Sequence, residues 1–436
     1  MHSFIARPLY QTAAKFRNPS LHGELDRLFA SEFLPQRELT QIQLARLVDL
    51  LDHAGTWSSY YGALFRKLGF RPSGLSSVED LKRLPIIEKA SLIEHNKSIH
   101  SSFAFRRTFK AETSGTSGTA LEFFKSERWD STVRAHLYRG YARFGVHPAD
   151  RNGYLWGYNL RPSQQRKVRL LDWMQNRERL FQLDTASVEA FARRLRAASY
   201  LSGYSSMVYE IAKVVNKAGI ELPHLKMVKG TSEMILDAYQ VEAERAFGRR
   251  IISEYGAAEA GLIAFECEKG ALHVNCEDVI LETEADGSVL VTNLVSHSFP
   301  IIRYRLGDVV SMSGARCDCG RAHPVIDAVQ GRRGSVVIGH SQSYPALVFY
   351  YVFKNIAIES GILMNYRALQ DEPGKVTLLI EHGANAVHTP LIESQLTRYF
   401  RSDVDVDLAF VDEFPRERRK AQYFESRIGT RSTVGS

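Results

Sequence analysis

The stretch TSGTSGTALEFFK, residues 113–125, decides how this chain is interpreted. Its first seven residues are all Gly, Ser or Thr, and the apolar run behind them predicts a strand. Glycines let backbone N–H groups approach phosphate oxygens, and the hydroxyls add further donors. A Walker loop would have a lysine after Gly118 and a helix behind it, and a Rossmann turn would also lead into a helix. What remains is a strand–loop–strand turn, which by itself is equally consistent with a flexible surface loop.

Composition limits the class of protein. The 436 residues, 44% of them hydrophobic and 24% charged, can form more than one core. The net charge of +7 comes from scattered basic residues, which favours a solvated basic face over a nucleic-acid surface. The N-terminus lacks the apolar core of a signal peptide, and the longest apolar run, residues 346–353, is too short to span a bilayer. We therefore expect a cytoplasmic protein with no nucleic-acid partner and no membrane span, whose cysteines are reduced or bind metal.

The pattern along the chain predicts a mixed α/β protein. Residues 37–69 have apolar side chains at helical spacing and end on a glycine that can cap a helix. Residues 106–112 and 121–126 predict strands on either side of the opening loop, and a helix follows them. Residues 187–255 alternate helix and strand, as in a wound sheet, whereas residues 272–313 predict short alternating strands. The pattern restarts after Arg332, where we place a domain boundary.

Three further motifs follow the opening loop in a fixed order. They are EYGAAEAG at 254–261, YRLGD at 304–308, and the lysine-bearing FPRERRKAQYF at 414–424. Together with TSGTSGTAL, this ordered set resembles the adenylate-forming superfamily, and the resemblance is closest to the branch of phenylacetate-CoA ligases and CapK proteins. It covers about residues 37–428, supported by phrases such as LPIIEKASL and CDCGR. The resemblance implies an α/β adenylate-forming fold. A large N-terminal domain, residues 1–331, would combine wound α/β sheets with a strand-rich lobe, and a small mobile C-terminal α+β domain, residues 332–436, would carry the catalytic lysine.

The resemblance also implies roles for individual residues. Tyr255, next to Gly256, would lay its ring against adenine, a task suited to a large flat face. Glu259 would hold the Mg²⁺ that bridges the ATP phosphates, and Asp308 would accept hydrogen bonds from the ribose hydroxyls. Lys420 would bring positive charge to the α-phosphate as a carboxylate attacks it. The loop residues expected to hold the phosphates, joined by Arg332 at the domain junction, are Ser114, Gly115, Thr116, Ser117, Gly118 and Thr119; Thr116 is also expected to be catalytic.

The implied substrate is a small carboxylic acid, activated with ATP and then passed to a nucleophile such as coenzyme A. Aromatic and small residues would line the acid pocket, which suits an aryl or medium-length acyl acid. Trp156 and Tyr158 serve equally well as packing residues. The residues that the resemblance places at the pocket are Trp156, Gly157, Tyr158, Ser205, Tyr209, Gly230, Thr231, Ala257 and Ala258.

Cys267, His273, Cys317 and Cys319 supply four ligands of the kind that tetrahedral zinc prefers. A similar arrangement in some members of the branch resembles a structural metal site. The alternative is a group of buried reduced thiols, since the sequence gap between the two pairs is long. Cys276 lies close by but falls where relatives have glutamate, so we leave it out of the predicted site.

The chain departs from the family pattern at the predicted hinge. Gly334 and Ser335 stand in GRRGSVV where relatives have aspartates, and the Lys420 segment is shorter and lacks a glycine. Adenylation is therefore better supported than thioester formation. A second hypothesis stays open: a degenerate member that binds nucleotide or acyl-adenylate without full turnover, as a partner in a polysaccharide or natural-product pathway.

Overall fold

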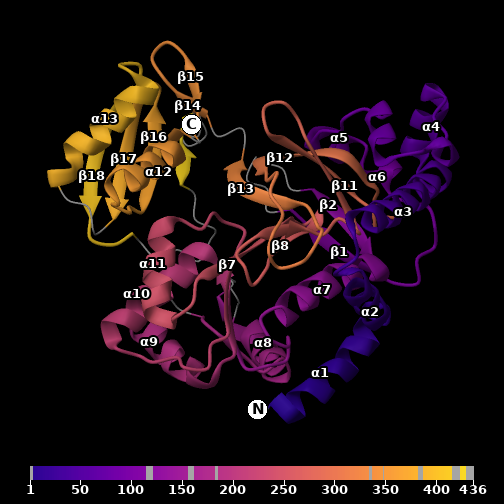
Figure 1. Cartoon of the computed structure of the whole chain (residues 1–436), viewed down its shortest axis with the longest axis horizontal. Helices are drawn as coiled ribbons and strands as arrows, with labels where there is room; N and C mark the ends of the chain where they lie inside the picture. Colours follow the sequence, from indigo (N-terminus) through magenta and orange to yellow (C-terminus); the bar gives the residue numbers. More distant parts are fainter. Residues whose placement is uncertain are drawn as a thin grey trace. The chain divides into compact units, whose positions relative to one another are not determined.

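The structure is a computed structural model of the chain. It describes residues 3–113, 121–155, 162–181, 185–332, 336–346, 348–381, 386–414 and 423–428. The chain divides into two compact units (Figure 1). The first comprises Met1–Asn152, Arg166–Arg177 and Ile252–Val329, and the second comprises Gly153–Gln165, Glu178–Ile251 and Gln330–Ser436. The step from Val329 to Gln330 lies close to the predicted boundary, but the second unit also takes in a middle segment of the chain. The division into residues 1–331 and 332–436 stays a prediction.

The first unit begins with helices. They are α1 (Ser3–Arg17), α2 (Leu21–Ser31), α3 (Gln36–Trp57), α4 (Ser59–Leu68), α5 (Lys89–Glu94), α6 (Asn96–Ile99) and α7 (Glu127–Ala142). The helical stretch expected over 37–69 is two helices, because Ser58 has an extended backbone and its Oγ caps α4 by accepting from Tyr61 N. Gly69 ends α4 in the left-handed region at φ 60°, so the predicted glycine cap is confirmed.

The opening stretch forms the predicted strand–loop–strand turn. Strands β1 (Thr108–Glu112) and β2 (Glu122–Ser126) pair antiparallel, with Glu112 opposite Glu122. Beyond this register, Thr113 N donates to Leu121 O at 3.0 Å, and Leu121 N donates to Thr113 Oγ1 at 3.0 Å. These two bonds close the base of the loop. Ser126 then caps α7, since its Oγ accepts from Trp129 N.

The sheet of the first unit has the strand order β10-β11-β12-β13-β9-β8-β7. The strands are β7 (Ile251–Ala257), β8 (Gly261–Glu266), β9 (Leu272–Val274), β10 (Val279–Thr283), β11 (Ser288–Asn293), β12 (Ile301–Met312) and β13 (Val325–Arg332). Inward-facing side chains of these strands share one apolar core with α3, α4 and the β1–β2 hairpin. Short strands were predicted for residues 272–313, and the structure confirms them.

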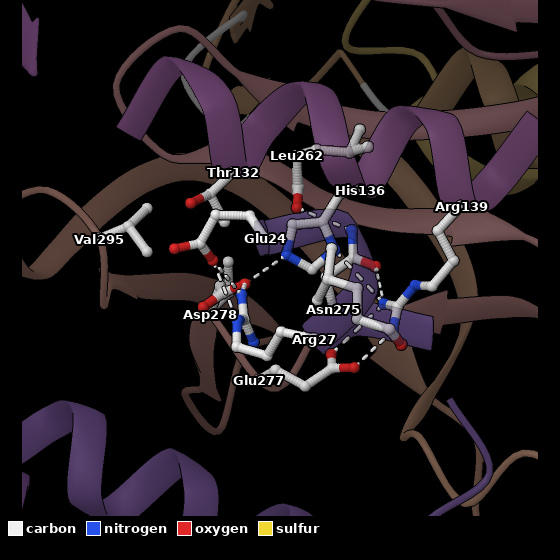
Figure 2. Close-up of polar contacts among 12 residues, drawn as sticks. Glu24, Arg27, Thr132, His136, Arg139, Leu262, Asn275, Glu277, Asp278 and Val295 are labelled. Atoms are coloured by element: carbon white, nitrogen blue, oxygen red, sulfur yellow. Dashed lines mark hydrogen bonds and ion pairs between the residues drawn. The ribbon is translucent and has the colours of Figure 1, made fainter. Parts of the chain in front are cut away.

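A buried ionic network holds α2 and α7 against the turn that precedes β10 (Figure 2). Arg139 donates to Asn275 Oδ1 at 3.0 Å and also to Glu277 Oε1. Asp278 accepts from Arg27 Nη2 at 2.6 Å and lies 2.7 Å from His136 Nε2. Charges buried this deeply are tolerated only with such partners, so the network fixes the packing of these helices.

The second unit combines parallel strands with the C-terminal sheet. The middle of the chain contains β3 (Asn152–Leu155), α8 (Pro162–Met174), β4 (Arg177–Arg179), α9 (Thr185–Arg194), β5 (Tyr200–Tyr204), α10 (Ser205–Ala218), β6 (Met227–Thr231) and α11 (Asp237–Phe247); most of α8, from Arg166 on, belongs to the first unit. Here the strand order is β6-β5-β3-β4, and β5 and β6 run parallel, as the alternating helix and strand pattern predicted.

The C-terminal segment adds α12 (Val348–Ser360) and α13 (Thr389–Phe400) to the strands β14 (Val336–Ile338), β15 (Ser343–Pro345), β16 (Tyr366–Glu372), β17 (Lys375–Glu381), β18 (Asp405–Val411) and β19 (Phe424–Ser426). Its main sheet has the order β18-β17-β16-β19. Figure 1 shows α12 and α13 beside this sheet. Residues from the middle and C-terminal segments form one apolar core. Among the described residues, no helix is long and apolar enough to cross a membrane.

Candidate active site

The turn between β7 and β8 carries two of the predicted site residues. Tyr255 lies on β7, and Glu259 lies in the turn, with only 6% of its surface exposed. Gly256 allows this turn to be tight, since a Cβ at that position would stand 2.4 Å from Gly261 O. The first glycine of the EYGAAEAG motif therefore serves backbone packing, and the tyrosine and glutamate are its predicted functional side chains.

Tyr255 and Asp308 meet although 53 positions separate them in the sequence. The Tyr255 hydroxyl donates to Asp308 Oδ2 at 2.9 Å. Gly307, directly before the aspartate, has φ +86°, a conformation that side-chain-bearing residues rarely adopt. Two residues assigned to the nucleoside from separate motifs thus lie in direct contact. Asp308 remains partly exposed.

Glu259 is held by neighbours on the same sheet. The Tyr304 hydroxyl donates to Glu259 Oε1 at 3.1 Å, and Asn293 Nδ2 donates to the backbone oxygen of Glu259 at 3.2 Å. Among the described residues, no donor contacts Glu259 Oε2, so this oxygen can bind a hard cation such as Mg²⁺. Sequence reasoning missed Tyr304. Its signal was present, because Tyr304 is the first residue of the YRLGD motif.

Several predicted residues lie outside the described part of the chain, and their roles stay predictions. The backbone of Arg332 ends β13, but its side chain is not described. The predicted site residues that fall wholly outside the described ranges are Ser114, Gly115, Thr116, Ser117, Gly118, Thr119, Trp156, Gly157, Tyr158 and Lys420.

Four residues predicted for the acid pocket lie together in the second unit. Thr231 and Gly230 are on β6, and a Cβ on Gly230 would come within 2.5 Å of Ser205 Oγ at the start of α10. Tyr209, one turn further along α10, stacks on Tyr239 with ring centroids 4.4 Å apart. Two other predicted pocket residues, Ala257 and Ala258, lie at the end of β7 and in the turn after it, in the first unit.

The predicted zinc ligands also come together. Ligand atoms of Cys267, His273, Cys317 and Cys319 all lie within 4.8 Å of one another. The sulfurs of Cys267 and Cys317 are 3.7 Å apart, and Cys319 Sγ is 3.2 Å from His273 Nε2. Two sulfurs on one tetrahedral zinc, each bonded at about 2.3 Å, stand about 3.8 Å apart. The group therefore matches the spacing of a zinc site.

His273 is oriented for a metal. Its Nδ1 lies 3.1 Å from His323 O, which fixes the proton on Nδ1 and leaves Nε2 as a ligand. Cys276 stays out of the set, as expected. It belongs to a separate buried group with Glu277 and His323, where Arg139 already neutralises the glutamate.

Comparison with known proteins agrees with this geometry. No known protein-family profile matches the chain. CapK of Staphylococcus aureus is 20% identical over 288 residues, which cover 63% of this chain and 63% of CapK, less than two thirds of its length. The phenylacetate-coenzyme A ligase of Thermus thermophilus is 24% identical over 342 residues, 70% of this chain and 73% of the relative. A solved 2-hydroxyisobutyryl-CoA ligase in the postadenylation state, in complex with 2-HIB-AMP, has a TM-score of 0.71 at 17% identity and covers 92% of both chains.

The chain has the fold of the adenylate-forming ligases, and its curated relatives include CapK and a phenylacetate-CoA ligase. Because the solved ligase shares only 17% identity, that comparison establishes the adenylate-forming fold. The fold explains why residues from two distant motifs, EYGAAEAG and YRLGD, meet at the β7–β8 turn and β12. The resemblance that the ordered motifs predicted is confirmed.

Proposed function

We propose that this adenylate-forming protein activates a small carboxylic acid with MgATP. A carboxylate oxygen attacks the α-phosphorus and pyrophosphate leaves, giving an acyl-adenylate. A nucleophile, coenzyme A or another acceptor, then attacks the acyl carbon and AMP leaves. The observation that carries this proposal is the contact between Tyr255 and Asp308, beside a buried Glu259 that keeps one oxygen available.

Each described residue has a task that its chemistry supports. The ring of Tyr255 would lie against adenine, and its hydroxyl orients the Asp308 carboxylate for the ribose hydroxyls. Glu259 would hold Mg²⁺, which when bound offsets the negative charge of the phosphates, and Tyr304 fixes the orientation of that carboxylate. We further propose that the loop after Thr113 binds the phosphates and that Lys420 stabilises charge developing at the α-phosphate.

The acid is proposed only by class. Small and aromatic residues at the predicted pocket suit an aryl or medium-length acyl acid, in line with phenylacetate in the name of one relative. The alternative function, binding of nucleotide or acyl-adenylate without turnover, rests on Gly334 and Ser335 at the predicted hinge.

The test is acid-dependent pyrophosphate release from ATP across a panel of aryl and acyl acids, with and without CoA. We expect release with at least one acid. Lys420→Ala should lower the rate about 100-fold, because it removes charge stabilisation from the transition state. Lys375→Ala is the matched control, since Lys375 is an exposed lysine of the same C-terminal segment.

Two results would count against the proposal. If the wild type binds ATP but releases no pyrophosphate with any acid, the binding-protein hypothesis replaces it. If Lys420→Ala releases pyrophosphate as fast as the wild type, the placement of the catalytic lysine is wrong.

A further inference from the structure

Lys125 ends the stretch TSGTSGTALEFFK, and its side chain faces inward. Alternation along β2 places Phe123 and Lys125 on one face, whereas Glu122 and Phe124 face solvent. The ammonium of Lys125 lies 5.5 Å from the ring centroid of Trp129 and 5.7 Å from that of Phe123. These two rings stack on each other with centroids 5.5 Å apart, and both are buried. An ammonium is therefore held against an aromatic wall at the edge of the core.

No described residue accepts a hydrogen bond from Lys125 Nζ or forms an ion pair with it. Within the described ranges the ammonium rests against the two ring faces. The nearby indole N–H of Trp129 is also buried, with no acceptor in the described ranges. Lys110, on the opposite face of the same hairpin, has an ion-pair partner. Its Nζ lies 2.8 Å from Glu122 Oε1, and both side chains are exposed. The hairpin thus has one paired lysine outside and one unpaired lysine inside.

The carboxylates near Lys125 already have other partners. Burial lowers the pKa of Lys125, while the charges of Asp130 and Glu259 act in the opposite direction. Asp130, however, accepts from Arg17 and from Arg134. Glu259 accepts from Tyr304 and is proposed to hold Mg²⁺. Removing an ammonium from water without a hydrogen-bond acceptor is costly, and the ring faces offset only part of that cost. An anion from outside the protein would supply the missing acceptor.

The position of Lys125 identifies the anion. The bonds between Thr113 and Leu121 close the base of the loop proposed to bind phosphates, and Lys125 follows on the strand that leaves this base. Besides Asp130, the charge of Glu259 raises the pKa of Lys125, and Glu259 is the proposed ligand of the phosphate-bound Mg²⁺. Both features connect Lys125 with the proposed phosphate site, which makes a phosphate oxygen the fitting acceptor.

We propose that Lys125 is a further nucleotide-binding residue, whose ammonium donates to an oxygen of the β- or γ-phosphate of ATP. The inference rests on the proposed function, because it needs a triphosphate at the loop. It gives the loop a fixed cation for the leaving pyrophosphate, distinct from Lys420, which is assigned to the α-phosphate.

The experiment is calorimetric titration of Lys125→Met with three ligands: MgATP, magnesium pyrophosphate and AMP. We expect the affinities for MgATP and pyrophosphate to fall about 10-fold or more, because one charge-assisted hydrogen bond is lost. The affinity for AMP should change less than about twofold. Lys110→Met is the matched control and should bind all three ligands as the wild type does. Lys125→Arg keeps the charge and should retain most of the affinity for MgATP.

Thermal unfolding separates a binding role from a structural one. Lys125→Met removes a partly buried charge that has no ion-pair partner in the described ranges, so it should not lower the midpoint of unfolding. The inference is overturned if Lys125→Met binds MgATP like the wild type, if it loses AMP and MgATP equally, or if it unfolds at a markedly lower temperature. A wild type that binds neither MgATP nor pyrophosphate overturns the proposed function and the inference with it, whereas normal wild-type binding with an unaffected variant overturns only the inference.

Discussion

Tyr255 combines two chemical groups in one side chain. Its ring is the flat surface proposed for adenine, and its hydroxyl donates to Asp308 at 2.9 Å. Only 7% of its surface is exposed, so both groups have fixed positions. Tyr304 plays a similar part for Glu259 on the same sheet. The two hydroxyls therefore orient two different carboxylates. Replacing each tyrosine by phenylalanine removes one hydroxyl at a time and can separate the two roles.

Tyr255→Phe keeps the ring and removes the hydrogen bond to Asp308. We expect the KM for ATP to rise about threefold to tenfold with little change in kcat. A change of this size corresponds to the loss of one hydrogen bond from an uncharged donor. Tyr304→Phe is the matched variant, and it should instead raise the Mg²⁺ concentration needed for half-maximal activity. Steady-state pyrophosphate release over a range of ATP and Mg²⁺ concentrations measures both. If the two variants shift the same parameter equally, the separate assignments fail.

At the scale of elements, the segment between β12 and β13 has no regular secondary structure, yet it carries Cys317 and Cys319. Cys267 directly follows β8, and His273 is the central residue of β9. A metal bound by all four would tie this segment to the sheet, because two of its ligands come from the segment and two from beside β8 and on β9.

We expect the purified protein to contain about one zinc per chain by elemental analysis. Cys317→Ser should reduce zinc to well below one equivalent and lower the thermal midpoint, since the ligand set becomes incomplete. Cys276→Ser is the control, because Cys276 is also buried but lies outside the set. Wild-type protein with far less than one equivalent of zinc would leave the buried-thiol alternative standing.

At the scale of the whole molecule, the C-terminal segment is tied to α10 and α11 within the second unit. Lys213 Nζ on α10 lies 2.7 Å from Glu381 Oε1 on β17. Tyr423 OH donates to Met234 O at 3.0 Å, and Tyr239 OH donates to Asn365 Oδ1 at 3.3 Å. If the C-terminal domain rotates between the two half-reactions, as we expect from its family, these bonds must break and re-form.

Lys213→Met should destabilise the protein by about 3 kcal/mol in urea unfolding, because Glu381, only 1% exposed, loses its cation. Burial alone raises the pKa of Glu381, but Lys213, Asn365 and the Phe414 N–H lower it overall. The pair therefore contributes stability at neutral pH. This contribution is lost as the pH falls below about 4 and passes through the lowered pKa of Glu381, because the carboxylate becomes protonated. The free energies of unfolding of wild type and variant should therefore converge in acid.

The control for this prediction is Lys217→Met, an exposed lysine on the same helix. A Lys213→Met/Glu381→Gln double variant should recover part of the lost stability, because position 381 no longer holds a buried charge without a cation. Equal stability of Lys213→Met and the wild type at neutral pH would show that the pair does not hold the C-terminal segment.

Much of the secondary structure could be predicted because its causes are local. Apolar periodicity predicted the helices around residues 37–69 and 127–142, and alternation predicted the strands of the hairpin and of residues 272–313. The break at Ser58 was missed, since a single capping serine inside an apolar pattern is a weak signal.

The sequence by itself determined the order of the four motifs, and with it the superfamily, because residue types and their spacing are properties of the chain alone. Only the tertiary structure decided which residues meet. Tyr255 contacts Asp308, and Cys267 lies beside Cys317, because strand order and register bring together segments about fifty residues apart. Lys125 reads as an ordinary strand lysine in the sequence. Its unpaired position against Phe123 and Trp129 becomes visible only when the packing of β2 on α7 is known, since burial depends on the neighbours that folding supplies.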